Sequence, residues 1–305
     1  MVVTALRQAC LEVAERARHV RIDAGAIPGY AAALVPGSGL ASPEPDLTEP
    51  AVRERVAAYW LTLDAINFGS GWFPTLRKSA QPTGYRTIEA GVRRRFEESR
   101  QWTASELSAI EPSELAALMD QDPEHELLGL FADSLRDLGR NLAAAGGSFA
   151  ALVDGAGGSA VSLVETLARW RCFADTSVYE GIELPFLKRA QIAAADLHRG
   201  GIGGFADIGA LTMFADNLVP HVLRLDGVLS FEPQLVATIE RGELIAHDSP
   251  EEIEIRACAV HAVELIVAAS PVPVTAAEVD ETLWNRGQQP AYKAVPRHRS
   301  RTTAY

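Results

Sequence analysis

The sequence of 305 residues is long enough for one large or two ordinary domains, and its 48% hydrophobic and 22% charged residues are typical of a globular protein with a substantial core. The net charge of −12 disfavours tight binding of DNA or tRNA, which requires many phosphate contacts, but permits a mononucleotide held in a local basic pocket. No long polar linker divides the chain, so we predict a single domain over residues 1–305.

The cysteines and the apolar runs bear on the cellular compartment. Cys10, Cys172 and Cys258 are far apart and form no Cys-x-x-Cys pair, which is typical of small buried side chains in a reducing compartment. The sequence shows neither a cationic start followed by an apolar signal core nor an apolar run that could span a bilayer. We therefore predict a cytoplasmic protein that does not contact a membrane.

The chain begins with helical patterns. Residues 3–20 carry apolar side chains at helical spacing and predict an amphipathic helix. His19, near its end, is either part of a solvated helix terminus or a polar group at the rim of a pocket. Residues 36–47 predict a loop. Thr48-Glu49-Pro50 then predicts the start of a helix that ends at Asn67-Phe68-Gly69.

An aromatic, glycine-rich loop and a basic stretch follow. Ser70-Gly71-Trp72-Phe73-Pro74 is either a packed loop anchored by its aromatic rings or a ligand loop, since glycines allow close backbone approach and aromatic faces stack on bases. Residues 77–100 are rich in arginine, which usually indicates a solvated face. One of these arginines is a candidate for binding a phosphate.

The rest of the chain is also predominantly helical in pattern. Capping boxes at Thr103–Glu106, Ser249–Glu252 and Thr275–Glu278 predict three further helix starts. Strand patterns are scarce: the chain has no Asn-Gly or Asp-Gly hairpin signal, and the moderate β candidates lie near residues 228–236. We predict an all-α or nearly all-α fold. The polar, basic tail from Arg286 to Tyr305 is expected to wrap the surface.

Lys188 and Asp216, in the stretch from Glu183 to Arg224, are single charges set into otherwise apolar segments. Lys188 and Asp216 are costly there unless they are paired or used. Because Val219 precedes Pro220, we expect Asp216 under the N-terminus of the helix that Pro220 opens, where backbone N–H groups hold a carboxylate ionised. A buried carboxylate facing a lysine suits cleavage of a sugar–base bond, whose transition state is an oxocarbenium cation.

Several motifs are absent. The sequence has no Walker loop, no Gly-x-Ser-x-Gly, no His-Glu-x-x-His and no His/Cys cluster at metal spacing, so we expect neither a metal ion nor an organic cofactor. The Gly200–Gly204 run follows no strand and is not a dinucleotide fingerprint. As a hairpin between two helices it is a weak sign of a helix-hairpin-helix DNA glycosylase. From the residues alone, the chain is a helical enzyme or binding domain with a notable Lys188/Asp216 pair.

The Phe-Leu-Lys-Arg-Ala-Gln-Ile run at residues 186–192 resembles the signature of the queuosine salvage family. The Leu-Thr-Met-Phe-Ala-Asp run at 211–216, with a proline four residues on, also resembles that family. The resemblance covers roughly residues 50–305. It departs at 69–74 and at Asn285, where an aspartate is expected. Further matching residues are Asp196, Glu254-Ile255-Arg256 and Asn67-Phe68.

The resemblance implies hydrolysis of queuosine 5′-monophosphate to queuine and ribose 5-phosphate, for queuine salvage into tRNA, by an all-helical protein similar to helix-hairpin-helix DNA glycosylases. It implies Asp216 as the catalytic carboxylate, with Lys188 beside it in the site. Two alternatives stay open: a non-catalytic queuine or nucleoside binder, and a glycosylase that acts on polymeric nucleic acid. The candidate substrate-binding residues are His19, Asn67, Phe68, Trp72, Phe214, Trp284 and Asn285.

Overall fold

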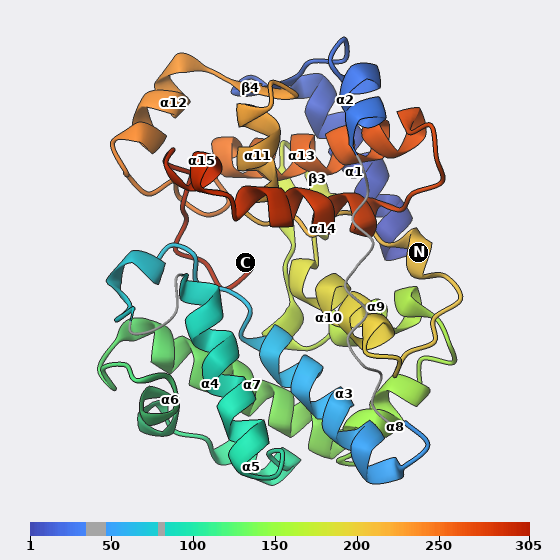
Figure 1. Ribbon diagram of the computed structural model, residues 1–305, viewed down its shortest axis with the longest axis vertical. Coiled ribbons are helices and arrows are strands. Elements are labelled where there is room, and N and C mark those ends of the chain that lie inside the picture. The colour runs from blue at the N-terminus through green and yellow to red at the C-terminus, as the bar shows by residue number, and fades with distance from the viewer. Residues whose placement is uncertain (35–46, 79–82) are drawn as a thin grey trace.

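The protein is mostly helical, as expected (Figure 1). A computed structural model describes residues 1–34, 47–78 and 83–305. No helix in these described ranges is long and apolar enough to cross a membrane. The predicted loop at 36–47 falls almost entirely outside them.

The first ten helices are α1 (Val2–Arg16), α2 (Ile27–Ala33), α3 (Pro50–Ala65), α4 (Gly84–Glu98), α5 (Ala104–Ala109), α6 (Pro112–Met119), α7 (Glu126–Ala144), α8 (Phe149–Asp154), α9 (Ala160–Leu167) and α10 (Lys188–Arg199). The later helices are α11 (Val219–Leu225), α12 (Pro233–Glu240), α13 (Pro250–Ala269), α14 (Ala276–Gly287) and α15 (Pro290–Lys293). The strands are β1 (Val20–Ile22), β2 (Ser177–Tyr179), β3 (Ile182–Leu184) and β4 (Leu229–Phe231), and single 3₁₀ turns lie at Phe73–Thr75, Arg171–Phe173 and Ile208–Ala210.

The predicted helix starts agree with the structure. Helix α3 begins at Pro50, and complete capping boxes open α5 at Thr103 and α14 at Thr275. At α13 the Ser249 side chain accepts a hydrogen bond from Glu252 N at 3.3 Å. The Glu252 carboxylate accepts instead from Asp248 N at 3.2 Å, so only half of the predicted box forms.

The predicted helix at 3–20 ends earlier than expected, and the prediction is wrong for its last residues. Helix α1 stops at Arg16, and Val20 begins β1, which pairs antiparallel with β4. The cause is a distant carboxylate: Glu254 Oε2 accepts hydrogen bonds from the backbone nitrogens of Arg18 at 2.9 Å, His19 at 2.7 Å and Val20 at 3.1 Å. These bonds hold the chain in an extended form that local periodicity does not reveal.

A second two-stranded sheet, β2 with β3, is a hairpin that the sequence analysis missed. Its turn residues Glu180 and Gly181 both have positive φ angles, 48° and 86°. This is the geometry of a two-residue hairpin turn, in which asparagine or aspartate is the usual first residue. Glutamate in that position concealed the signal.

Two buried hydrophobic clusters organise the helices. The first cluster is formed mainly by α3 to α10, with α3 packed on α10 and α5 on α7. The second cluster is formed mainly by α1, α2 and α11 to α14, with α1 packed on α13. Figure 1 shows these two groups of helices at opposite ends of the molecule, with the C-terminus between them.

The expectation that the tail from Arg286 to Tyr305 wraps the surface is wrong for residues 297–305, whereas Gln289, Pro290, Ala291 and Lys293 are exposed. Gly69 N donates to Tyr305 O at 3.0 Å, and Ile245 N donates to Arg299 O at 2.9 Å. A side chain at Gly71 would place its Cβ atom 2.4 Å from Ser300 O, so this close approach requires glycine. Residues 297–305 therefore form an internal strap, and several of them are buried: His298, Ser300, Thr302, Ala304 and Tyr305.

Candidate active site

A cavity of about 330 Å³ is lined by elements of both clusters. Its walls come from the end of α3 and the loop after it, from α4, α10 and α14, from residues 214–218, and from the C-terminal strap. The structure brings together most of the residues predicted from the sequence. Those that line the cavity are Asn67, Phe68, Lys188, Asp196, Phe214, Asp216, Trp284 and Asn285.

Asp216 lies three residues before Val219, the first residue of α11, in agreement with the prediction from Val219-Pro220. Its Oδ1 atom accepts hydrogen bonds from Leu218 N at 2.8 Å and Val219 N at 3.1 Å. Both are backbone donors at the start of a helix, where the positive end of the helix dipole favours a carboxylate. The Oδ2 atom has no hydrogen-bond partner among the described residues. One oxygen thus fixes the side chain while the other is left for the cavity.

Lys188 is the first residue of α10 and is buried. Its Nζ atom donates to Asn67 O at 3.0 Å. Burial lowers the pKa of the ammonium group, while the charges of Asp216 and Asp64 oppose that shift. The described residues show no direct ion pair between Lys188 and Asp216. Lys188 is therefore a buried donor that lies within electrostatic reach of the carboxylate and keeps hydrogen-bonding capacity for a ligand.

Two further carboxyl groups in the cavity have raised pKa values. Burial raises the pKa of Asp196 to about 6, against the opposing charges of Arg199 and Lys188. Burial, reinforced by the negative charge of Asp216, raises the pKa of Asp280 well above its usual range. Asp280 Oδ1 also accepts a hydrogen bond from Phe214 N at 3.0 Å. The cavity thus combines an acid favoured in its neutral form with one held by helix N–H groups.

Three arginines line the cavity, and they differ in the partners that they have among the described residues. Arg86 pairs with Glu89 at 2.6 Å. Arg199 pairs with Asp196 at 3.0 Å and with a second acid on α14. Arg297, on the strap, forms no ion pair or hydrogen bond with the residues that the structure describes, and burial lowers its pKa while the charge of Asp216 raises it. An unpaired, half-buried cation is suited to bind an anionic group.

The aromatic residues of the cavity differ in accessibility. Phe68 is only 1% exposed and packs edge-on against Phe131 at 5.0 Å between ring centroids. Trp284 is half-buried and meets the Tyr85 ring edge-on at 5.9 Å. Phe214 is 6% exposed. Trp284 and Tyr85 therefore offer the accessible ring surface, whereas Phe68 is mainly a core residue.

Two predicted residues lie elsewhere. His19 lines a separate cavity of about 130 Å³, and its Nδ1 atom lies 2.7 Å from Glu232 Oε1. Trp72 is buried, and its Nε1 atom donates to Glu126 Oε2 at 2.7 Å. Of the loop that contains Trp72, Ser70 and Phe73 do line the main cavity.

Four residues that shape the cavity were not predicted from the sequence. Asp280 was detectable, because it lies on the buried face of α14 with Val279 and Leu283, where an isolated acid is unusual. Arg297 gave no signal, since the strap has no periodicity that would predict burial. Tyr85 and Arg199 lie on amphipathic helices and were concealed by the many polar neighbours around them.

One group of residues could hold a metal ion in the described part of the chain: His247, Asp248 and Glu252. None of the three lines the cavity. The Arg256 Nη1 atom lies 3.6 Å from Glu252 Oε1, so a cation already faces the buried acid of this group.

Comparison with known proteins supplies the last finding. The family described as queuosine salvage protein matches residues 47–305. A protein of Sphaerobacter thermophilus named queuosine 5′-phosphate N-glycosylase/hydrolase is 37% identical over 83% of this chain and 82% of its own length. Proteins of the same name from Mus musculus (30% identical, 98% of each chain) and Schizosaccharomyces pombe (32% identical, 76% of this chain and 71% of its own) are also similar.

Proposed function

This chain belongs to the queuosine salvage protein family, and we propose that it hydrolyses the N-glycosidic bond of queuosine 5′-monophosphate. The products are queuine and ribose 5-phosphate. The observation that carries the proposal is the arrangement of Asp216, whose Oδ1 atom is held by two helix N–H groups. A carboxylate fixed in this way presents its charge without reorganisation, which is what an oxocarbenium transition state requires.

The chemistry of the base explains the weight placed on the sugar. Queuine is a 7-deazaguanine, so its five-membered ring has no N7 atom to protonate. Departure of the base therefore depends on stabilising the positive charge that develops at C1′, which is the role of Asp216. Two routes follow from the same geometry, since Oδ2 either orients the attacking water or bonds to C1′ directly. Rapid denaturation during turnover, followed by mass spectrometry, distinguishes them by the presence of a glycosyl adduct.

Lys188 supports the carboxylate and binds the sugar. Its ammonium group is buried and donates one hydrogen bond to Asn67 O, so further N–H donors are left for ribose hydroxyls. The pKa of Lys188 is lowered by burial and raised by Asp216, so the two charges support each other. Neutralising either one removes that support.

The 5′-phosphate binds at Arg297. This guanidinium is the cavity arginine without a partner among the described residues, whereas Arg86 and Arg199 are already paired with acids. A guanidinium binds phosphate through parallel N–H donors. The base lies against Trp284, with Phe214 and Asn285 beside it; Phe68 and Asn67 complete the wall.

We also propose where the product is used, where the protein acts and which fold it resembles. The released queuine serves tRNA modification, and the protein acts in the cytoplasm, which agrees with its three free buried cysteines. The fold is similar to that of helix-hairpin-helix DNA glycosylases. The predominantly helical fold supports this likeness, although a 3₁₀ turn rather than a helix follows the Gly200–Gly204 run.

The test is to incubate the purified protein with queuosine 5′-monophosphate in the presence of a chelator and to follow free queuine by chromatography. We expect release of queuine together with an equal amount of ribose 5-phosphate. Tight binding of queuine without release from the nucleotide would contradict the enzymatic function and leave a binding protein. Release from queuosine-containing tRNA, lost steeply as salt is raised, would support the glycosylase of polymeric nucleic acid instead.

A further inference from the structure

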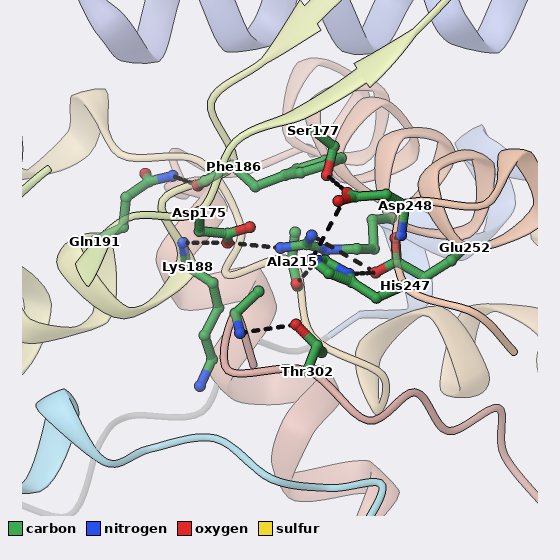
Figure 2. Close-up of polar contacts among 12 residues, drawn as sticks. Asp175, Ser177, Phe186, Lys188, Gln191, Ala215, His247, Asp248, Glu252 and Thr302 are labelled. Carbon is green, nitrogen blue, oxygen red and sulfur yellow. Dashed lines mark hydrogen bonds and ion pairs between the residues drawn. The ribbon is translucent and has the colours of Figure 1, made fainter. Parts of the chain in front are cut away.

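A fully buried ion pair outside the cavity lining joins the segment that contains Lys188 to the segment that contains Asp216. Arg256, on α13, is 0% exposed, and its Nη2 atom lies 2.6 Å from Asp175 Oδ2. The same Asp175 oxygen accepts a hydrogen bond from the backbone nitrogen of Lys188 at 3.0 Å. Figure 2 shows Asp175 beside that backbone nitrogen, while the side chain of Lys188 points away from it.

The other side of Arg256 faces the second catalytic segment. Its Nε atom donates to Ala215 O at 3.0 Å, and Ala215 is the residue directly before Asp216. One guanidinium therefore contacts both segments, the Asp216 segment directly and the Lys188 segment through Asp175. Figure 2 labels Ala215 and Asp175, the two residues that these hydrogen bonds join to Arg256.

Packing restricts the guanidinium further. It lies over the Phe186 ring at 3.9 Å and over the Tyr305 ring at 4.7 Å from the ring centroids. Phe186 is two residues before Lys188, and Tyr305 lines the cavity. Lysine has no planar fork and cannot reproduce two directed hydrogen bonds together with stacking between two rings.

We propose that Arg256 and Asp175 are positioning residues that set the separation of Lys188 and Asp216. This inference rests on the proposed function for its catalytic consequence. Neither residue lines the cavity, so neither contacts the substrate. Their effect is geometric: a misplacement of about 1 Å in a catalytic group lowers the rate by about 100-fold.

A second cross-link joins the same two segments and defines what the ion pair adds. Gln191 Nε2 donates to Thr212 Oγ1 at 2.9 Å, and Thr212 N donates to Gln191 Oε1 at 3.0 Å. This link fixes the first turn of α10 to the start of the 212–216 segment. Arg256 acts at the other end, next to the two charges, so its loss leaves the segments joined but frees their catalytic ends.

The first test is kinetic. In Arg256→Met we expect kcat to fall by about 100-fold while KM changes by less than about threefold, because Arg297 and Trp284, which bind the phosphate and the base, stay in place. In the Asp216→Asn background the same substitution should cost less than about threefold, since a residue that acts through Asp216 has nothing left to position. Equal losses in both backgrounds would overturn the proposal. Arg256→Lys should restore only part of the rate.

The second test does not depend on activity. The sequence has three lysines, Lys78, Lys188 and Lys293, so ¹³Cε-lysine NMR gives three titrating signals, and Lys188→Arg assigns the buried one. Besides Asp216, the charges of Asp64, Asp280 and Arg189 act on the Lys188 ammonium. Removing the positive charge of Arg256 would by itself raise the pKa of Lys188. Withdrawal of Asp216 from Lys188 would lower that pKa.

If Arg256 sets the separation of Lys188 and Asp216, the effect of withdrawing Asp216 exceeds that of the lost Arg256 charge. The pKa of Lys188 should then be lower in Arg256→Met than in the wild type, and a higher pKa would overturn the proposal. If the wild type released no base, the proposed function would fail while the titration still tested the positioning. Should Arg256→Met not fold, Asp175→Asn/Arg256→Met removes both members of the ion pair and leaves the buried Glu252 with Asp248 N and His247 as partners, so this double variant serves instead. Asp207→Asn is the control, because Asp207 Oδ1 accepts from Ala160 N at 2.6 Å at another helix start and does not line the cavity.

Discussion

The charge of Asp216 should account for a large part of the rate enhancement, and Asp216→Asn measures it. Asparagine has the same shape, and its carbonyl oxygen can accept the two hydrogen bonds from Leu218 N and Val219 N. The substitution therefore removes the negative charge and leaves the side chain anchored. A loss of activity can then be assigned to electrostatics rather than to a displaced loop.

The size of the loss follows from the geometry of the site. A carboxylate about 4 Å from the cationic C1′ region interacts with it by about 4 kcal/mol at an effective dielectric constant of about 20. Since about 1.4 kcal/mol corresponds to a factor of ten, this energy is equivalent to roughly 1,000-fold. Loss of a single preorganised electrostatic group typically costs about 100- to 1,000-fold. We expect kcat for Asp216→Asn to fall within that range.

The assay is single-turnover release of queuine from queuosine 5′-monophosphate, with enzyme in excess so that product release does not mask the chemical step. The carboxylate of Asp207 accepts a hydrogen bond from Ala160 N at the start of α9. Asp207→Asn is therefore the matched control and should keep wild-type rates. A rate for Asp216→Asn within about tenfold of the wild type would refute the reasoning and move the catalytic role elsewhere. Asp196→Asn would then be measured next.

Three further predictions follow from the cavity and the strap. Arg297→Gln should raise KM for the nucleotide by about 10- to 100-fold and leave the rate on the corresponding nucleoside unchanged. The reason is that only the nucleotide has the phosphate that we propose Arg297 binds. Equal losses on both substrates would place the phosphate elsewhere. The folded-state pKa of Asp196 is raised to about 6, so its stabilising contribution is complete below the unfolded pKa near 3.8 and is lost as the pH rises through 6. Between pH 4.5 and 7.5, the free energy of unfolding of Asp196→Asn should therefore rise by about 1 to 3 kcal/mol relative to that of the wild type, as measured by urea unfolding. Gly71→Ala should lower the free energy of unfolding by about 1 to 3 kcal/mol and reduce activity, because the new Cβ atom would lie 2.4 Å from Ser300 O and displace the strap, and unchanged thermal stability would contradict this.

The sequence was most informative where a local rule operates. Capping boxes at Thr103 and Thr275 and the proline at residue 50 predicted helix starts that the structure confirms. Pro220 placed Asp216 near the start of a helix correctly, because proline is favoured in the first turn of a helix, although Val219 lies inside α11 and not at the predicted break.

The sequence was least informative where a distant group decides the local structure. Residues 18–20 leave the predicted helix because Glu254, more than 230 positions away, accepts their backbone hydrogen bonds. The strap is buried because Gly71 has no side chain and the Ser300 backbone can pack closely against it. No periodicity within the strap predicts that contact. Arg297 was missed for the same reason.

The two hydrophobic clusters explain why Lys188 and Asp216 lie where they do. Phe186 belongs to the second cluster and Leu187 to the first, so the chain crosses between the clusters just before Lys188. The same crossing occurs before Asp216, where Phe214 packs in the first cluster and Ala215 in the second.

A crossing is the place where a charge can be buried without being enclosed, since neither cluster extends over it and the cavity forms in the space that they leave. It is also a place where small shifts between the clusters would change the distance between the two charges. The Arg256–Asp175 pair lies at this boundary, and its bonds to Ala215 O and Lys188 N oppose such shifts. That residues 1–305 form a single domain stays a prediction, but the mechanism requires the two clusters to act as one body. A rigid buried pair at the crossing supplies that requirement with few atoms.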